Sequence, residues 1–238
     1  MNIRPYIIIN GKNSKDIPGL LIGSIPTITK PKIRTTIEEI DGKDGDIVTV
    51  LGYGAYDKPV EIGLYGDYDI DEIAGFFNSS GEIVFSNEPD KCYNFSVYDH
   101  IDFERLIRYK TATVTFHVQP FKYSATDRKK IFDSPSSPLQ IVNYGNIYSA
   151  PVYKIKASGN VALSMNGVHV LNIAFGSSVA EIKIDVAELE AYALPSGALA
   201  NRSVAGDYND LRLDTGKNIL SWTGNIQSME IDKFVRWV

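Results

Sequence analysis

The chain has 238 residues, of which 44% are hydrophobic and 22% charged, and its formal net charge is −5. This composition is that of a folded soluble protein, and it excludes both a largely disordered chain and a basic protein that coats nucleic acid nonspecifically. The length favours one large or two modest domains, and we expect two.

The sequence contains no candidate membrane span and few residues that could serve thiol chemistry or metal binding. No run approaches the roughly 18 apolar residues of a membrane span, and the start lacks the apolar core of a secretory signal. We therefore expect a soluble protein made in a cytoplasm. Cys92 is the single cysteine, and the histidines (His100, His117 and His169) lie far apart in the sequence. We expect no metal, no cofactor and no catalytic residue.

Short runs with period-two alternation predict that the first half is mainly β. Within residues 113–118, Val114, Phe116 and Val118 fall on one face and polar side chains on the other. Comparable runs, separated by Gly, Asn, Asp and Pro, occupy residues 6–9, 47–51, 60–65, 83–85 and 93–98.

One helix is predicted after Asp69, which can cap it while Glu72 reaches back to complete a capping box. We expect Gly81 to end this helix and the helix to pack on a sheet. The apolar stripe at helical spacing consists of Ile70, Ile73, Ala74 and Phe77.

Residues 67–71 also place carboxylates at alternate positions, as the opening of an EF-hand loop does. That interpretation fails further on, because position six would be Glu72 in place of glycine and position twelve Asn78 in place of Glu. Helix capping is therefore the preferred interpretation.

A second acidic segment surrounds Gly42 and Gly45. One hypothesis makes its carboxylates cation ligands or an acid and base pair, but Asp-Gly pairs suit tight reversals, so we prefer a solvated turn. The carboxylates belong to Glu38, Glu39, Asp41, Asp44 and Asp46.

Motifs of nucleophilic or phosphate chemistry are missing from the sequence: there is no Gly-x-Ser-x-Gly, no Walker loop and no Gly-x-Gly-x-x-Gly. Cys92 as a nucleophile, with His100 or His117 as its base, is an alternative that nothing in the sequence supports. A small, partly buried cysteine is the preferred interpretation.

The two halves of the chain differ in charge, because all of the net negative charge belongs to residues 1–125. The Ser- and Pro-rich residues 133–138 cannot continue a strand or helix and are predicted to link domain 1–132 to domain 139–238. Asn166-Gly167 predicts a hairpin turn in the second domain. Its short runs at 151–157, 161–165, 168–173, 180–186, 211–213, 218–222 and 229–235 predict a β-sandwich.

Aromatic side chains are the remaining candidates for binding in the second half. Tyr192, Tyr208 and Trp222 could form a platform for stacking on a glycan, but packing in the core is the preferred interpretation.

Short segments in matching order extend along nearly the whole chain, and they carry a resemblance. In the first half they are Ile9-Asn10-Gly11, Asp41-Gly42-Lys43-Asp44-Gly45, residues 81–86, 89–93 and 113–121. In the second half they are residues 143–146, 150–153, 184–185 and 216–219. Their order and spacing resemble the distal tail protein family of long, non-contractile-tailed phages and prophages of Gram-positive bacteria.

The resemblance implies a mainly β fold: an N-terminal β domain with one packed α-helix, and a C-terminal galectin-like β-sandwich. It also implies a structural, non-enzymatic virion protein, assembled in the host bacterial cytoplasm into the virion tail. Six copies would form a ring that joins the tail tube protein to a tail-associated hub protein and to receptor-binding or baseplate proteins. DNA would pass through the lumen without specific binding.

Exposed loops and strand edges are suited to such ring contacts. The loop that we expect at a subunit interface comprises Asp41, Gly42, Lys43, Asp44, Gly45 and Asp46. The alternative function is that of a carbohydrate-binding β-sandwich protein, or of a glycoside hydrolase that uses two of the carboxylates.

Overall fold

The structure, a computed structural model, describes residues 4–42, 44–77, 80–97, 99 and 101–238. The chain divides into two compact units after Ala125, ahead of the boundary expected at residues 133–138. The reason is β10 (Lys129–Asp133), which pairs along its length with β18 (Gly216–Asp232) in the second unit. Among the described residues, no helix is long and apolar enough to cross a membrane.

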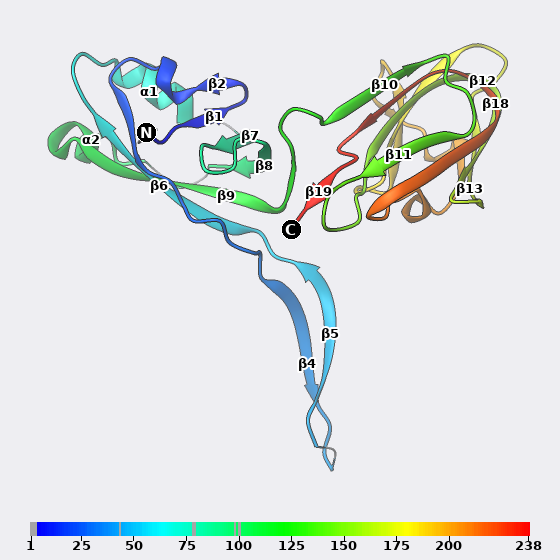
Figure 1. The fold of residues 1–238 in the computed structure, drawn as a ribbon, viewed down its shortest axis with the longest axis horizontal. Helices are drawn as coiled ribbons and strands as arrows, with labels where there is room; N and C mark the ends of the chain where they lie inside the picture. Colours follow the sequence, from blue (N-terminus) through cyan, green and yellow to red (C-terminus); the bar gives the residue numbers. More distant parts are fainter. Residues whose placement is uncertain (1–3, 43, 78–79, 98, 100) are drawn as a thin grey trace. The chain divides into compact units, whose positions relative to one another are not determined.

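An antiparallel sheet forms the first unit, with strand order β2-β1-β7-β8-β9-β6-β3 (Figure 1). Burial alternates along its strands as the sequence predicts, so the mainly β prediction is confirmed. The strands are β1 (Ile7–Ile9), β2 (Lys12–Asn13), β3 (Leu20–Ser24), β6 (Tyr56–Leu64), β7 (Ser80–Phe85), β8 (Lys91–Ser96) and β9 (Thr111–Ser124).

The predicted helix is α1 (Ile70–Phe77). The Asp69 carboxylate accepts hydrogen bonds from the backbone N–H groups of Asp71 (2.9 Å) and Glu72 (3.3 Å), which confirms helix capping over the EF-hand interpretation. The capping box is wrong, because the Glu72 carboxylate instead pairs with the Lys12 ammonium at 3.2 Å.

Gly81 was also wrongly predicted: it lies within β7 and does not end the helix. Its φ is +141°, and a Cβ there would lie 2.1 Å from Asn10 Oδ1. The Asn10 side chain occupies that space because it donates to the Ser80 carbonyl (3.1 Å) and accepts from the Glu82 N–H (2.9 Å). Glycine is therefore required for a side-chain bridge to a strand.

A second helix, α2 (Phe103–Tyr109), has no counterpart among the sequence predictions. Asp102 caps it by accepting from the Arg105 N–H at 2.8 Å. Phe103, Leu106 and Ile107 form a short apolar stripe at helical spacing, but only Leu106 is buried.

The second unit is built on two long strands, β12 (Val152–Met165) and β18, which pair with each other on both sides of a bend. The first part of β12 also pairs with β14 (Ala180–Asp185), and its last part pairs with β13 (Val168–Ala174). One hydrophobic core takes side chains from both pairings, as in a two-layered sandwich. The sequence predicted two separate strands in place of each long one.

The expected Asn166-Gly167 turn joins β12 to β13, with φ of 51° and 85° at the two residues. Residues 211–213 are not a strand; Leu211 instead ends a 3-10 helix, η3 (Tyr208–Leu211). The other strands after residue 125 are β11 (Leu139–Asn143), β15 (Glu190–Leu194), β16 (Ala198–Leu199), β17 (Val204–Gly206) and β19 (Arg236–Trp237). Two short 3-10 helices complete the elements: η1 (Ser14–Asp16) and η2 (Asn201–Ser203).

Gly224 makes the bend of β18 possible, since its φ is +96° and a Cβ would lie 2.4 Å from the Asn160 carbonyl oxygen. We expect Gly224→Ala to destabilise the second unit by about 3 kcal/mol. Gly167→Ala is the control: its φ is +85° but the space around it is open, so we expect about 1 kcal/mol. Urea unfolding followed by Trp fluorescence measures both; equal losses would contradict this explanation of the bend.

Candidate functional site

A β-hairpin that belongs to neither large sheet is the most exposed structure in the first unit. Its strands, β4 (Ile33–Glu39) and β5 (Asp46–Tyr53), pair only with each other (Figure 1). All of β4 and most of β5 are exposed. We call residues 33–53 the arm; at about 3.4 Å per residue its strands extend over roughly 24 Å.

Exposed apolar side chains occur on both faces of the arm, and three of them form a stripe on one face. Ile37 lies opposite Val48, and Val50 follows Val48 on the same face. Their exposed fractions are 59%, 56% and 65%. A two-stranded hairpin is only marginally stable in water, and a contiguous exposed apolar patch on a soluble protein typically marks a surface for a partner. The apolar stripe, as we call these three residues, has the properties of a contact surface.

The tip of the arm contains the predicted interface loop. Gly42 and Gly45 have φ of 81° and 82° with open space around them, so the glycines serve the turn and not a close contact. Asp46 begins β5 opposite Glu39, while Lys43 lies outside the described residues. No group of three or more His, Cys, Asp or Glu side chains within the described part of the chain is arranged to hold a metal ion. The tip is a solvated acidic turn in this structure.

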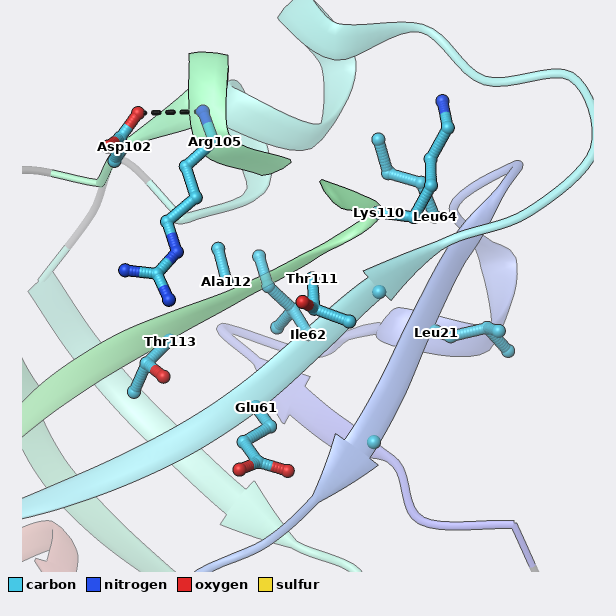
Figure 2. A pocket seen from close by; sticks show the side chains of 12 residues that line it. Leu21, Glu61, Ile62, Leu64, Asp102, Arg105, Lys110, Thr111, Ala112 and Thr113 are labelled. Atoms are coloured by element: carbon cyan, nitrogen blue, oxygen red, sulfur yellow. Dashed lines mark hydrogen bonds between the residues drawn. The ribbon is translucent and has the colours of Figure 1, made fainter. Parts of the chain in front are cut away.

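A groove of about 680 Å³ lies beside α2 and is lined by residues of β3, β6 and β9 (Figure 2). The guanidinium of Arg105 points into it, and Glu61 lies farther along the sheet. The Asp102 carboxylate at its edge is engaged in capping α2. Among the described residues, no hydrogen bond joins the Thr111 or Thr113 hydroxyl to a base.

Cys92 and His117, weighed in the sequence as a nucleophile and its base, have separate partners. Cys92 is buried, and its Sγ lies 3.8 Å from the Ser124 carbonyl oxygen. The Nδ1 atom of His117 lies 2.7 Å from the Asp57 carboxylate. His100, the other candidate base, lies outside the described residues.

The three aromatic residues considered for a glycan platform lie on different elements: Tyr192 on β15, Tyr208 on η3 and Trp222 on β18. Tyr208 and Trp222 pack against the hydrophobic core. The Tyr192 hydroxyl donates to the Glu190 carboxylate, which raises the pKa of that hydroxyl. No ring contact within the described residues joins any two of the three.

Comparison with known proteins gives results at the level of structure. No protein-family model and no curated protein sequence matches the chain. The crystal structure of the SPP1 Dit protein, described as a paradigm of the hub adsorption apparatus in phages that infect Gram-positive bacteria, is 14% identical with a TM-score of 0.66. The alignment covers 98% of this chain and 99% of that one. The chain has the Dit fold.

Chains from the phage p2 baseplate in its activated conformation share this fold. In the structure with Ca the identity is 9% and the TM-score 0.57, covering 99% of this chain and 98% of that one. In the structure with Sr the values are 10% and 0.54, covering 96% and 97%. The resemblance to phage distal tail proteins is therefore confirmed in the fold of the whole chain, although the sequence identities are only 9–14%.

From the sequence we predicted the turn of the arm and one of its two strands, but not the other strand. Residues 47–51 were predicted as a strand and the Asp-Gly pairs as turns, yet residues 33–39 were not assigned. A stronger signal was present, because Asp-Gly pairs flanked by alternating Ile, Val and Thr on both sides are typical of a hairpin.

Proposed function

We propose that this protein is a structural component of a phage or prophage tail, a distal tail hub that forms a hexameric ring. The ring joins the end of the tail tube to the tail-tip or baseplate apparatus. The single observation that carries the proposal, beyond the fold, is the arm with its exposed apolar stripe. A side-chain surface of this kind is stabilised when another chain covers it.

Ring formation is one geometry that covers the stripe on every copy. Contact between the arm of one copy and a different surface of the next is heterologous, and such contacts close into a ring when the rotation between copies permits. The pairing of β4 and β5 with no further strand also leaves two strand edges for a neighbouring sheet. Both features support assembly through the first unit.

The proposed partners follow from the position of such a ring in a tail. They are the tail tube protein, a tail-associated hub protein, and receptor-binding or baseplate proteins, with DNA passing through the lumen without specific binding. The protein acts in the virion tail after assembly in the host bacterial cytoplasm, and we propose no enzymatic activity for it.

Shortening the tip of the arm tests the proposed interface loop. Replacing residues 40–45 by Asn-Gly leaves a two-residue reversal between Glu39 and Asp46, so the hairpin is expected to form while Asp41 and Asp44 of the acidic tip are lost. We expect association to weaken by about tenfold, roughly 1.4 kcal/mol. Sedimentation velocity over a dilution series measures the association. Unchanged association would show that the loop is not part of the interface and would leave strands β4 and β5 as the contact.

A further inference from the structure

The segment that leads into the arm, residues 25–32, has no regular secondary structure, yet it is held by side chains from elsewhere in the first unit. The Lys58 ammonium donates to the Thr27 carbonyl at 3.0 Å. The Asn87 amide donates to the Pro26 carbonyl at 3.0 Å, and the Tyr56 hydroxyl donates to the Thr29 carbonyl at 3.5 Å. Three of the four carbonyls of residues 26–29 are thus bound by side chains. We call residues 25–32 the root of the arm.

Lys58 is an unusual group to find in this position, because its exposed fraction is only 2%. Its ammonium lies 5.1 Å from the ring centre of Tyr93, 5.4 Å from that of Tyr56 and 5.5 Å from that of Phe85. An ammonium that faces several aromatic rings is stabilised by cation–π attraction. Burial nevertheless lowers the pKa of Lys58, as expected for a charge removed from water.

The hydrogen bonds of Lys58 depend on the root. An ammonium has three donors, and within the described residues the Thr27 carbonyl is the one acceptor bonded to it. No carboxylate in the described part of the chain lies within 4.0 Å of it. If the root moved away, a buried ammonium would lose its hydrogen bond, which is costly in a protein interior.

A second buried group holds the ring that faces Lys58. Glu88, with an exposed fraction of 8%, accepts a hydrogen bond from the Tyr93 hydroxyl at 2.7 Å and pairs with the Lys122 ammonium at 3.0 Å. These contacts fix the orientation of Tyr93. The Tyr93 ring of the cage is therefore held by buried groups of the first unit that lie outside the root.

We propose that Lys58 and its aromatic cage are an anchor that fixes the root of the arm, so that the arm leaves the first unit in one set direction. This anchor rests on the proposed function in one respect only: the role of the arm as a contact surface explains why a fixed direction is useful. An arm that is ordered before assembly loses less conformational entropy when a partner covers it.

The experiment uses the full chain with Ile28, a root residue 54% exposed, replaced by Cys and labelled with a nitroxide. Cys92 is 3% exposed and is expected to label slowly. Lys58→Met keeps a long unbranched side chain inside the cage but removes the charge and the donor. We expect the rotational correlation time of the label, from electron paramagnetic resonance, to fall by about threefold or more.

Two controls make this result specific. A label at Val168→Cys, in the second unit and 64% exposed, should keep its mobility in the Lys58→Met protein. Asn87→Ala removes an exposed donor to the root and leaves the buried charged groups in place, so we expect a smaller increase in the mobility of the label at position 28. This variant still tests how the root is held if Lys58→Met fails to fold. Unchanged mobility at position 28 in every folded variant would overturn the anchor.

Association measured on the same samples separates this inference from the proposed function. A looser label with weaker association supports both. A looser label with unchanged association upholds the anchor and contradicts the role of the arm in assembly. An unchanged label with weaker association contradicts the anchor alone.

Discussion

Placing charges on the apolar stripe is expected to abolish assembly while each chain stays folded. Ile37→Lys combined with Val48→Glu puts opposite charges on a directly opposed pair, so the hairpin keeps a favourable cross-strand contact. The surface loses two apolar side chains, each contributing about 1.5 kcal/mol when buried, so association should weaken by at least about 100-fold. Sedimentation velocity at several concentrations measures the loss.

The neighbouring cross-strand pair provides a matched control. Thr36 lies opposite Thr49 on the other face of the arm. Thr36→Lys combined with Thr49→Glu introduces the same two charges at the same spacing without altering the apolar stripe. We expect association close to that of the parent protein. If both double variants weakened association equally, the effect would belong to the arm as a whole and the stripe would not be its contact surface.

Phe116→Ala is expected to be the most destabilising single substitution in the core of the first unit. Phe116 is fully buried, and its ring contacts those of Phe95, Phe85 and Phe77 at centroid distances of 5.4, 6.3 and 6.3 Å. Removing a buried phenylalanine costs about 3–5 kcal/mol through lost burial and the cavity that is left. Hydrogen exchange of β9 peptides in a urea series measures the change.

Thr113→Ala, on the exposed face of the same strand, serves as the comparison. It changes strand propensity slightly without creating a cavity, so we expect a loss below about 0.5 kcal/mol. A loss below about 1 kcal/mol for Phe116→Ala would mean that its aromatic neighbours do not form the stabilising centre of this core.

Local patterns in the sequence were sufficient to predict that the chain is mainly β and that α1 is a helix. Alternation along β9 and the Asp69 cap depend on residues close in sequence, and both are as predicted. Gly81 was misassigned because its role comes from Asn10, which is 71 positions away in the chain. The continuity of β12 through a bend likewise depends on a partner strand, and a break in alternation at Gly159 looks the same as a turn.

For the candidate site, too, local features could be predicted from the sequence and features of the tertiary structure could not. The Asp-Gly pairs identify the reversal at the tip, but the exposure of Ile37 and Val48 shows that no described element covers this face of the hairpin, which is a property of the tertiary structure. The burial of Lys58 could not be predicted either, because a lysine at the start of a strand is normally exposed. The rings around it come from β6, β7 and β8, and its acceptor comes from the root of the arm.

Electron microscopy of the purified full-length chain over a concentration series, alone and co-expressed with a tail tube protein, tests the central claim most directly because it reports shape and copy number together. The hub account predicts sixfold rings with a central hole, and their disappearance in the Ile37→Lys, Val48→Glu variant. Particles of a single chain at every concentration, with and without the tube protein, would contradict it.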